Sequence, residues 1–361
     1  MSVRVRIKDI AQMAGVSTGT VDRIIHKRGK VSAESQELVK LALTKLNYKP
    51  NIHMSAISTM KRYKVIVAIP ACARGEYWEQ LSGGVTAALR KFNMVDLDCQ
   101  FYQYDQFNLY SCIDVFESVV EAEPDGVIIG ATFSDIALKL SSALDAKSIP
   151  YIYVDSAVKG SNPIATCSTD QHACGYLVAK LIDSITPSDA EFALFKAKRI
   201  GNQGSTVTME RREGFMEYFN KTGKATVIHS VDFSVVNPDE NVELIGDFFE
   251  ENPKVKGAIV LSSRGHILAD YFAKHGVDDM KLICVDLTES NYKEINRGGI
   301  EFVISQRPSF QGFFAVEKLI EYLMYQEVSS EKTTIMPLDI ITKENVELYK
   351  KTAEANSSSL F

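Results

Sequence analysis

The sequence predicts an α/β protein that consists of a small helical head, a short linker and two doubly wound parallel sheets. Two short amphipathic segments flank a glycine near the N-terminus, and from residue 64 short apolar strands alternate with helices. Charge is also unevenly distributed: residues 1–62 contain twelve Lys or Arg and four Asp or Glu, whereas the remaining residues contain 28 and 42. A basic head on an acidic body indicates a polyanionic partner for the head alone. Solubility is the alternative explanation for these charges, but it would not predict that basic residues gather in the head and acidic residues in the body.

The head begins with two helices joined by a tight turn. Apolar side chains in residues 8–14 share one helical face, and Gly15 follows where a left-handed residue would end a helix. Ser17 stands where an N-cap is expected, and Val21 lies on the inner face of the second helix. The early polar residues of that helix remain outside, so the segment is typical of a helix-turn-helix. An ordinary helical hairpin is the alternative reading of this stretch alone.

A third helix completes a domain over residues 1–50, and residues 51–62 form a hinge or linker. Ser32 is the expected N-cap of this helix. Its inward face is expected to consist of Leu38, Leu41, Ala42 and Leu46.

The body, residues 63–350, alternates strands and helices strictly enough to predict two parallel sheets. We expect an N-terminal lobe of about 63–167 and 308–331, a C-terminal lobe of about 168–305 and 332–350, and a disordered tail over 351–361. The expected strands are 65–69, 99–104, 126–129, 151–154, 165–167, 192–195, 225–229, 258–261, 282–285 and 302–305.

Polar and aromatic residues gather just beyond these strands or in the first turn of the next helix. Parallel sheets bring such positions to one crevice. Carboxylate, guanidinium and amide groups hydrogen-bond vicinal hydroxyls, and flat aromatics pack on the faces of a sugar ring. Singly, each residue could instead be a helix cap, a core side chain or half of a surface ion pair. The candidates are Tyr77, Trp78, Asp155, Arg211, Ser262, Ser263, Asp286 and Gln306.

Several classes of protein are disfavoured. No apolar run approaches the length of a membrane span, and the N-terminus lacks an apolar signal-peptide core, so a cytoplasmic location is expected. The six cysteines show no zinc-like pairing, and the six histidines show no metal spacing, so no metal is expected. No nucleotide-binding or hydrolase motif is present, so neither a cofactor nor catalysis is expected. An enzyme acting on a sugar in the crevice remains a rival.

At the level of motifs, the chain resembles the lac-repressor-type (LacI/GalR) family of bacterial transcription regulators over nearly its whole length. The head carries Ile-Lys-Asp-Ile-Ala-Gln-Met-Ala-Gly-Val-Ser-Thr-Gly-Thr-Val-Asp-Arg at 7–23 and Leu-Asn-Tyr-Lys-Pro-Asn at 46–51. In the body, the stretch from Tyr77 to Val85, the run Glu-Arg-Arg-Glu-Gly-Phe at 210–215, Val285-Asp286 and Ser305-Gln306 are similar to that family's effector domain and to ribose-type periplasmic binding proteins, which have the type I fold.

For the head, the resemblance implies a homodimer whose second helices enter major grooves of a near-palindromic operator. Thr18, Gly19 and Arg23 fall on base-reading positions, and Arg23 could hold guanine O6 and N7. Ile57 falls where a side chain wedges into the minor groove. The positions that the family uses for phosphate contacts are Ser17, Thr20, His26 and Lys30. Three residues depart from the family pattern: Asp22 replaces a serine, Arg6 replaces the Thr or Ser cap of the first helix, and Met54 replaces a small alanine.

For the body, the resemblance implies that Tyr77 and Trp78 stack on a sugar ring. It also implies that Asp155, Arg211, Asp286 and Gln306 bind hydroxyls. Ser262 and Ser263 replace the usual Asn-Asp pair, so the ligand need not be ribose. The expected function is a regulator, most simply a repressor, controlled by a small sugar or polyol. An activator, a corepressor-dependent repressor and a sugar-binding protein without DNA-binding activity are the alternatives.

Overall fold

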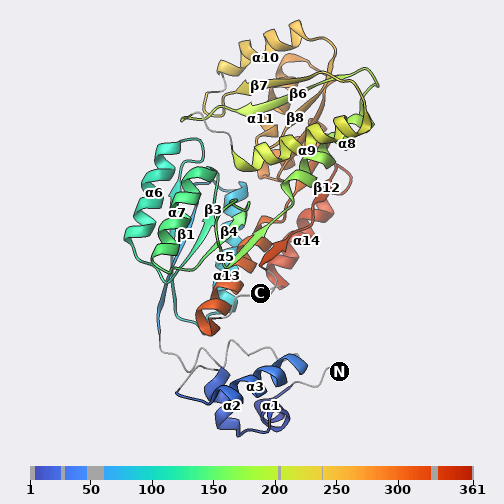
Figure 1. Cartoon of the computed structure of the whole chain (residues 1–361). Helices are drawn as coiled ribbons and strands as arrows, with labels where there is room; N and C mark the ends of the chain where they lie inside the picture. Colours follow the sequence, from blue (N-terminus) through green and yellow to red (C-terminus); the bar gives the residue numbers. More distant parts are fainter. Residues whose placement is uncertain are drawn as a thin grey trace.

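The computed structural model describes residues 5–25, 29–46, 61–201, 205–237, 239–326 and 332–359, with side chains of the last helix described as far as Thr352. It contains a three-helix head and two α/β lobes (Figure 1). The predicted fold class is therefore confirmed. No described helix is long and apolar enough to cross a membrane.

The head contains α1 (Ile7–Ala14), α2 (Thr18–Ile25) and α3 (Ala33–Lys45). Gly15 ends α1 in the left-handed conformation, with φ 67°. The Ser17 and Ser32 hydroxyls accept backbone N–H groups of Thr20 (3.0 Å) and Ser35 (3.3 Å), as expected of N-caps.

Arg6 begins α1 without a capping side chain, because a guanidinium has no acceptor. Its backbone N–H instead donates to the Asp9 carboxylate at 2.7 Å. One half of a capping box therefore compensates for the missing Thr or Ser.

The expected inner face of α3 was partly wrong. Leu38 and Leu41 are 43% and 57% exposed, whereas Val39 and Ala42 are buried and Leu43 and Leu46 pack against them. The buried positions 39, 42, 43 and 46 follow helical spacing, and the two exposed leucines lie out of phase with them.

The N-terminal lobe has a parallel sheet in the order β11-β5-β4-β3-β1-β2. Helices α5 and α13 cover one face of the sheet, and α6 and α7 cover the other. Its strands are β1 (Tyr63–Pro70), β2 (Leu97–Tyr104), β3 (Gly126–Gly130), β4 (Tyr151–Asp155), β5 (Ala165–Ser168) and β11 (Thr333–Ile335). Its helices are α5 (Tyr77–Lys91), α6 (Leu109–Glu121), α7 (Ser134–Ala146) and α13 (Pro308–Tyr325).

The C-terminal lobe repeats this plan in the order β12-β10-β9-β8-β6-β7, with only β12 antiparallel among its described strands. Helices α8 and α9 cover one face, and α10, α11, α12 and α14 cover the other. Its strands are β6 (Glu191–Ala197), β7 (Ile228–Phe233), β8 (Val255–Val260), β9 (Lys281–Val285), β10 (Phe302–Ser305) and β12 (Asp339–Ile341). Its helices are α8 (Gln171–Ile185), α9 (Thr206–Thr222), α10 (Asp239–Glu251), α11 (Gly265–His275), α12 (Glu289–Arg297) and α14 (Val346–Ser359).

The chain crosses between the lobes after β5, after β10 and between β11 and β12. We expected residues 332–350 in the C-terminal lobe, but β11 pairs with β5 of the other sheet, so the last crossing comes later. Arg307 and Asp339, beside the second and third crossings, form a bidentate ion pair at 2.7 and 2.8 Å.

Two other expectations need correction. The strand expected at 225–229 is β7 at Ile228–Phe233, because Val231 and Phe233 are buried whereas Val227 is exposed. The backbone is helical through Ser359 rather than disordered from 351. The head boundary at 50 and the hinge at 51–60 lie outside the described residues.

Close packing of α5 on α13 depends on Gly84. A Cβ there would lie 1.8 Å from the backbone oxygen of Ser309. A Cβ at Gly83, by contrast, would meet no described atom within 4 Å beyond its own surroundings in the helix. Of the pair Gly83-Gly84, only Gly84 is therefore required for helix packing.

Candidate functional site

The two lobes present matching carboxylates at equivalent strand ends. Asp155 ends β4, the fourth strand of the N-terminal lobe, and Asp286 follows β9, the fourth strand of the other. Both residues are left-handed, with φ of 71° and 69°. Such a backbone is uncommon outside glycine and is tolerated best by Asn and Asp, so both side chains are aimed by an unusual turn.

A cavity of about 560 Å³ lies between the lobes. Its wall combines the beginning of α5 with the carboxyl-end loops of both sheets. All eight residues singled out in the sequence line this cavity, namely Tyr77, Trp78, Asp155, Arg211, Ser262, Ser263, Asp286 and Gln306.

The aromatic pair opens α5 on the N-terminal side. The Trp78 ring is buried in the lobe core, where Gly130 leaves room for it: a Cβ at Gly130 would lie 2.6 Å from the ring. Tyr77 meets Trp78 edge-on, with centroids 5.0 Å apart, and its hydroxyl donates to the Asp155 carboxylate at 2.8 Å. Trp78 is thus both a core residue and part of the cavity wall.

A hydrogen-bond network joins the two lobes beneath the cavity. Gln306 donates to the Asp286 carboxylate at 2.6 Å and accepts from Gln171 at 3.0 Å. Gln171 also donates to the backbone oxygen of Asp155 and accepts from Nε of Arg211, each at 2.8 Å. A single chain of hydrogen bonds therefore connects the two aspartates of the site.

Arg211 is positioned by helix packing. A Cβ at Gly175 would lie 1.7 Å from the Arg211 backbone oxygen, so α8 and α9 touch at this point. The side chain is 2% exposed, and Nη1 donates to the Leu261 backbone oxygen at 2.8 Å. Nη2 is buried and has no hydrogen-bond partner among the described residues. A buried donor without a partner is costly, so this atom is available to an acceptor in the cavity.

Burial shifts the acids of the site. It raises the pKa of Asp286 to about 6, against the opposing effects of Arg211 and Gln306. Burial likewise raises the pKa of Asp155, although Arg211 and the Tyr77 hydroxyl oppose it. Both carboxyls are therefore costly to ionise, and each gains from a ligand hydroxyl that donates to it.

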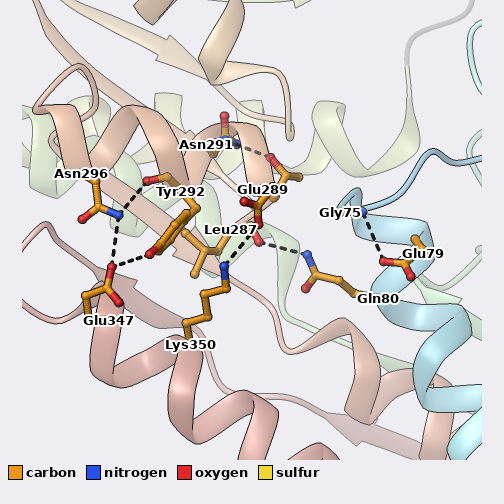
Figure 2. A network of polar contacts seen from close by, with 11 residues as sticks. Gly75, Glu79, Gln80, Leu287, Glu289, Asn291, Tyr292, Asn296, Glu347 and Lys350 are labelled. Carbon is orange, nitrogen blue, oxygen red and sulfur yellow. Dashed lines mark hydrogen bonds and ion pairs between the residues drawn. The ribbon is translucent and has the colours of Figure 1, made fainter.

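The lobes also contact each other directly. Arg264 of the C-terminal lobe and Glu76 of the N-terminal lobe form an ion pair at 2.5 Å. Elsewhere, Gln80 of α5 donates to the Leu287 backbone oxygen at 3.0 Å (Figure 2). The Glu289 N–H donates to the Gly75 oxygen at 2.9 Å, so the two lobes are held together around the site.

Helix α12 also contacts the last helix, α14. Lys350 of α14 pairs with Glu289, and Glu347 accepts from Tyr292 of α12 (Figure 2). Helix α14 is thus joined to α12, whose first residue, Glu289, also contacts Gly75 of the other lobe.

Four further residues of the cavity wall were not predicted from the sequence. Gln106 and Phe107 follow β2, Thr132 follows β3, and Arg199 follows β6. All occupy the strand-end positions that identified the other residues, so the same rule applied to every strand would have found them.

The DNA-facing candidates lie on the described part of the head. Thr18, Gly19 and Arg23 are exposed on α2, as a reading surface requires. The hydroxyls of Ser17 and Thr20 share a hydrogen bond at 2.9 Å beside them, and Lys30 is exposed. His26 and Ile57 lie outside the described residues.

Comparison with known families agrees with this division. Residues 6–51 match the family described as bacterial regulatory proteins, lacI family, and residues 65–327 match the periplasmic binding protein domain. The chain belongs to the lacI family of bacterial regulatory proteins. This lacI-family chain is a DNA-binding transcriptional regulator whose body is a periplasmic-binding-protein-type effector domain. A secreted binding protein would not account for the head.

Named relatives match a large part of the chain in sequence. The chain is 23% identical to the ribose operon repressor of Halalkalibacterium halodurans over 285 residues, 78% of this chain and 80% of that one. It is 26% identical to catabolite control protein A of Staphylococcus aureus over 228 residues, which span 61% of this chain and 62% of that protein.

Two solved structures illustrate the body. A chain assigned as a LacI transcriptional regulator from Bacteroides fragilis is 29% identical, with a TM-score of 0.76, and covers 80% of this chain and 100% of its own length. A solute-binding protein from Burkholderia graminis in complex with D-arabinose is 17% identical, with a TM-score of 0.70, and covers 80% of this chain and 97% of its own. The second likeness concerns the fold alone.

Proposed function

We propose that this lacI-family regulator is a homodimeric repressor whose affinity for a near-palindromic operator is set by a small sugar or polyol bound between the lobes. The observation that carries the proposal is the cavity itself. Two buried carboxylates, an amide and a guanidinium whose Nη2 lacks a partner among the described residues surround it, beside an aromatic pair. This is the set of groups that hydroxyl recognition requires. The relatives named as ribose and sucrose operon repressors support the same reading.

In this proposal, Thr18, Gly19 and Arg23 meet base edges, while Ser17, Thr20 and Lys30 meet phosphates. His26 is assigned to phosphate contact and Ile57 to the minor groove by resemblance. A regulator that binds operator DNA acts in the cytoplasm, and regulation rather than catalysis is the role of the cavity.

The ligand changes operator affinity through its differential affinity for two arrangements of the lobes. A coupling of about 1–3 kcal/mol corresponds to roughly 5- to 150-fold in DNA affinity. Because the lobes contact each other beside the cavity, the ligand completes its contacts in this scheme when the two lobes close on it.

The test combines operator selection, a sugar screen and light scattering on the purified chain. Selection from random DNA should yield a near-palindrome bound by a dimer. A sugar or polyol that raises the melting midpoint should change operator affinity in a fluorescence anisotropy titration. The double variant with Asp286→Ala and Arg211→Ala should keep operator binding and lose this response.

A monomer on DNA, or a double variant with normal calorimetric ligand binding, would contradict the proposal. Tighter operator binding with ligand would identify a corepressor-dependent repressor instead. The relative named as the purine repressor PurR of Pasteurella multocida motivates including purines in the screen.

A further inference from the structure

The wall of the interlobe cavity carries more cationic than anionic side chains. Its carboxylates are Asp155, Asp232 and Asp286. Its cations are Lys196, Lys198, Arg199, Arg211, Arg212 and Arg264. A neutral sugar needs no such excess of positive charge.

Several of these cations have carboxylate partners. Lys196 pairs with Asp232 at 3.1 Å, and Arg264 pairs with Glu76. Lys198 lies 3.7 Å from the Glu240 carboxylate. Arg199, by contrast, has no carboxylate within 4 Å among the described residues.

Arg199 is held by aromatic rings rather than by an ion pair with any described residue. Its guanidinium carbon lies 5.0 Å from the ring centroid of Phe133 and 5.7 Å from that of Phe107. Its single hydrogen bond among the described residues, to the Thr132 backbone oxygen, is long at 3.5 Å. The Arg264 guanidinium carbon lies 5.6 Å from the same Phe107 ring. Two guanidinium groups thus flank one aromatic side chain, and of the two only Arg264 has a described carboxylate partner. An anion beside Arg199 would compensate the charge of this half-buried side chain.

The helix that follows Arg199 adds to the positive potential in this part of the cavity. Helix α9 begins with Ser205 as N-cap, whose side chain makes no capping bond, and Ser205 and Thr208 line the cavity. The Thr206 hydroxyl is buried without a partner among the described residues, as is Nη2 of Arg211 on the next turn. Free N–H groups and the helix dipole favour a negative group at such a terminus.

We propose that the effector is an anionic sugar derivative, with its carboxylate or phosphate group against Arg199 and the beginning of α9 and its hydroxyls on Asp155, Asp286 and Gln306. This inference rests on the proposed function and names the ligand class of that site. The two buried carboxylates repel the anionic group, and Arg199 attracts it. The charges of the wall therefore fix one orientation of the ligand.

The test uses matched pairs of ligands on the purified full-length chain. Glucose is compared with gluconate, glucuronate and glucose 6-phosphate, galactose with galacturonate, and ribose with ribose 5-phosphate, by thermal shift and then calorimetry. At least one acid or phosphate should bind while its neutral parent binds more weakly. Whether the acids or the phosphates bind distinguishes the two anionic groups. Sodium phosphate and sodium sulfate alone serve as probes for an adventitious ion only.

Arg199→Met should raise the Kd of the anionic ligand about 30-fold or more, because a desolvated ion pair loses one partner. Lys274→Met is the matched control, since it removes a cation at the far end of α11, where Lys274 pairs with Asp270 at the surface. It should leave the Kd unchanged. The melting midpoint of each variant without ligand shows whether it is folded.

Neutral parents that bind as tightly as their acids and phosphates, with no effect of Arg199→Met, would overturn the anionic ligand and leave the sugar-controlled regulator standing. If sodium phosphate or sodium sulfate alone binds as tightly as the anionic sugars, the region around Arg199 and the beginning of α9 is an adventitious ion site only. That result would overturn the inference. A chain that responds to no sugar, neutral or charged, would overturn the proposed function together with it.

Discussion

Substitution of Asp286 by Asn should stabilise the ligand-free protein while weakening its ligand response. Burial raises the pKa of this carboxyl from an ordinary 3.8 to about 6, so the folded state binds its proton more tightly than the unfolded state does. The stability associated with that proton is fully present below pH 3.8 and is lost as the pH rises through about 6. Ionised Asp286 therefore costs about 3 kcal/mol above pH 7 and about 1 kcal/mol at pH 4.5.

Asn has nearly the same shape, and its carbonyl oxygen can still accept from Gln306. The Asp286→Asn protein should gain up to about 3 kcal/mol at pH 7.5, which corresponds to about 6–12 °C in melting midpoint. The gain should shrink steadily toward pH 4.5. Differential scanning calorimetry of both proteins across this pH range measures the effect, with the surface variant Asp270→Asn as control.

An Asp286→Asn midpoint equal to or below wild type at pH 7.5, or a difference that does not change with pH, would refute this reasoning. Addition of a ligand found in the screen provides a second check. The variant should show a smaller ligand-induced rise, because an ionised carboxylate accepts a hydroxyl proton more strongly than an amide does.

The remaining predictions concern the head, helix packing and the cavity. Arg23→Ala should cost about 1–3 kcal/mol of operator binding and relax one base position per half-site, whereas Lys40→Ala on α3 should preserve the sequence preference; an unchanged preference for Arg23→Ala in a selection experiment would exclude its groove contact. Gly84→Ala should lower the free energy of unfolding by about 1–3 kcal/mol or more, because its Cβ meets the backbone of α13. Gly83→Ala should be neutral or stabilising by up to about 1 kcal/mol. Equal free energies of unfolding for the two variants in chemical denaturation would contradict the packing argument. Arg211→Met should keep operator affinity and abolish the ligand-induced change in anisotropy, and a retained response would remove Arg211 from the site.

Local signals predicted the elements that form over many residues. Gly15 and Ser17 each have a conformational or hydrogen-bonding role that the residue type favours, so the turn of the head followed from the chain itself. Asp155 and Asp286 were found because parallel strands point their carboxyl ends at one crevice. The cavity that joins them agrees with that placement, while their contact with a ligand stays a prediction.

Other features depend on tertiary packing. Leu38 and Val39 are both apolar neighbours on a helix, and which of them is buried depends on how α3 rests on α1. Strands β11 and β12 have three residues each, too few for a periodic pattern. The strand-end position of Arg199 could have been read from the sequence, but its lack of a carboxylate partner among the described residues depends on how its neighbours are arranged.

The position of Gln306 has a mechanical consequence. It lies between β10 and α13, in one of the three segments on which the lobes would turn, and its backbone oxygen accepts from Gln311 of α13. Gln311 in turn accepts the Asp155 N–H at 2.9 Å, so both lobes reach this residue. A ligand that binds the Gln306 amide therefore acts directly on the segment about which the lobes would rotate. A small rotation about this segment would move the far end of the N-terminal lobe, where β1 begins, through a larger distance.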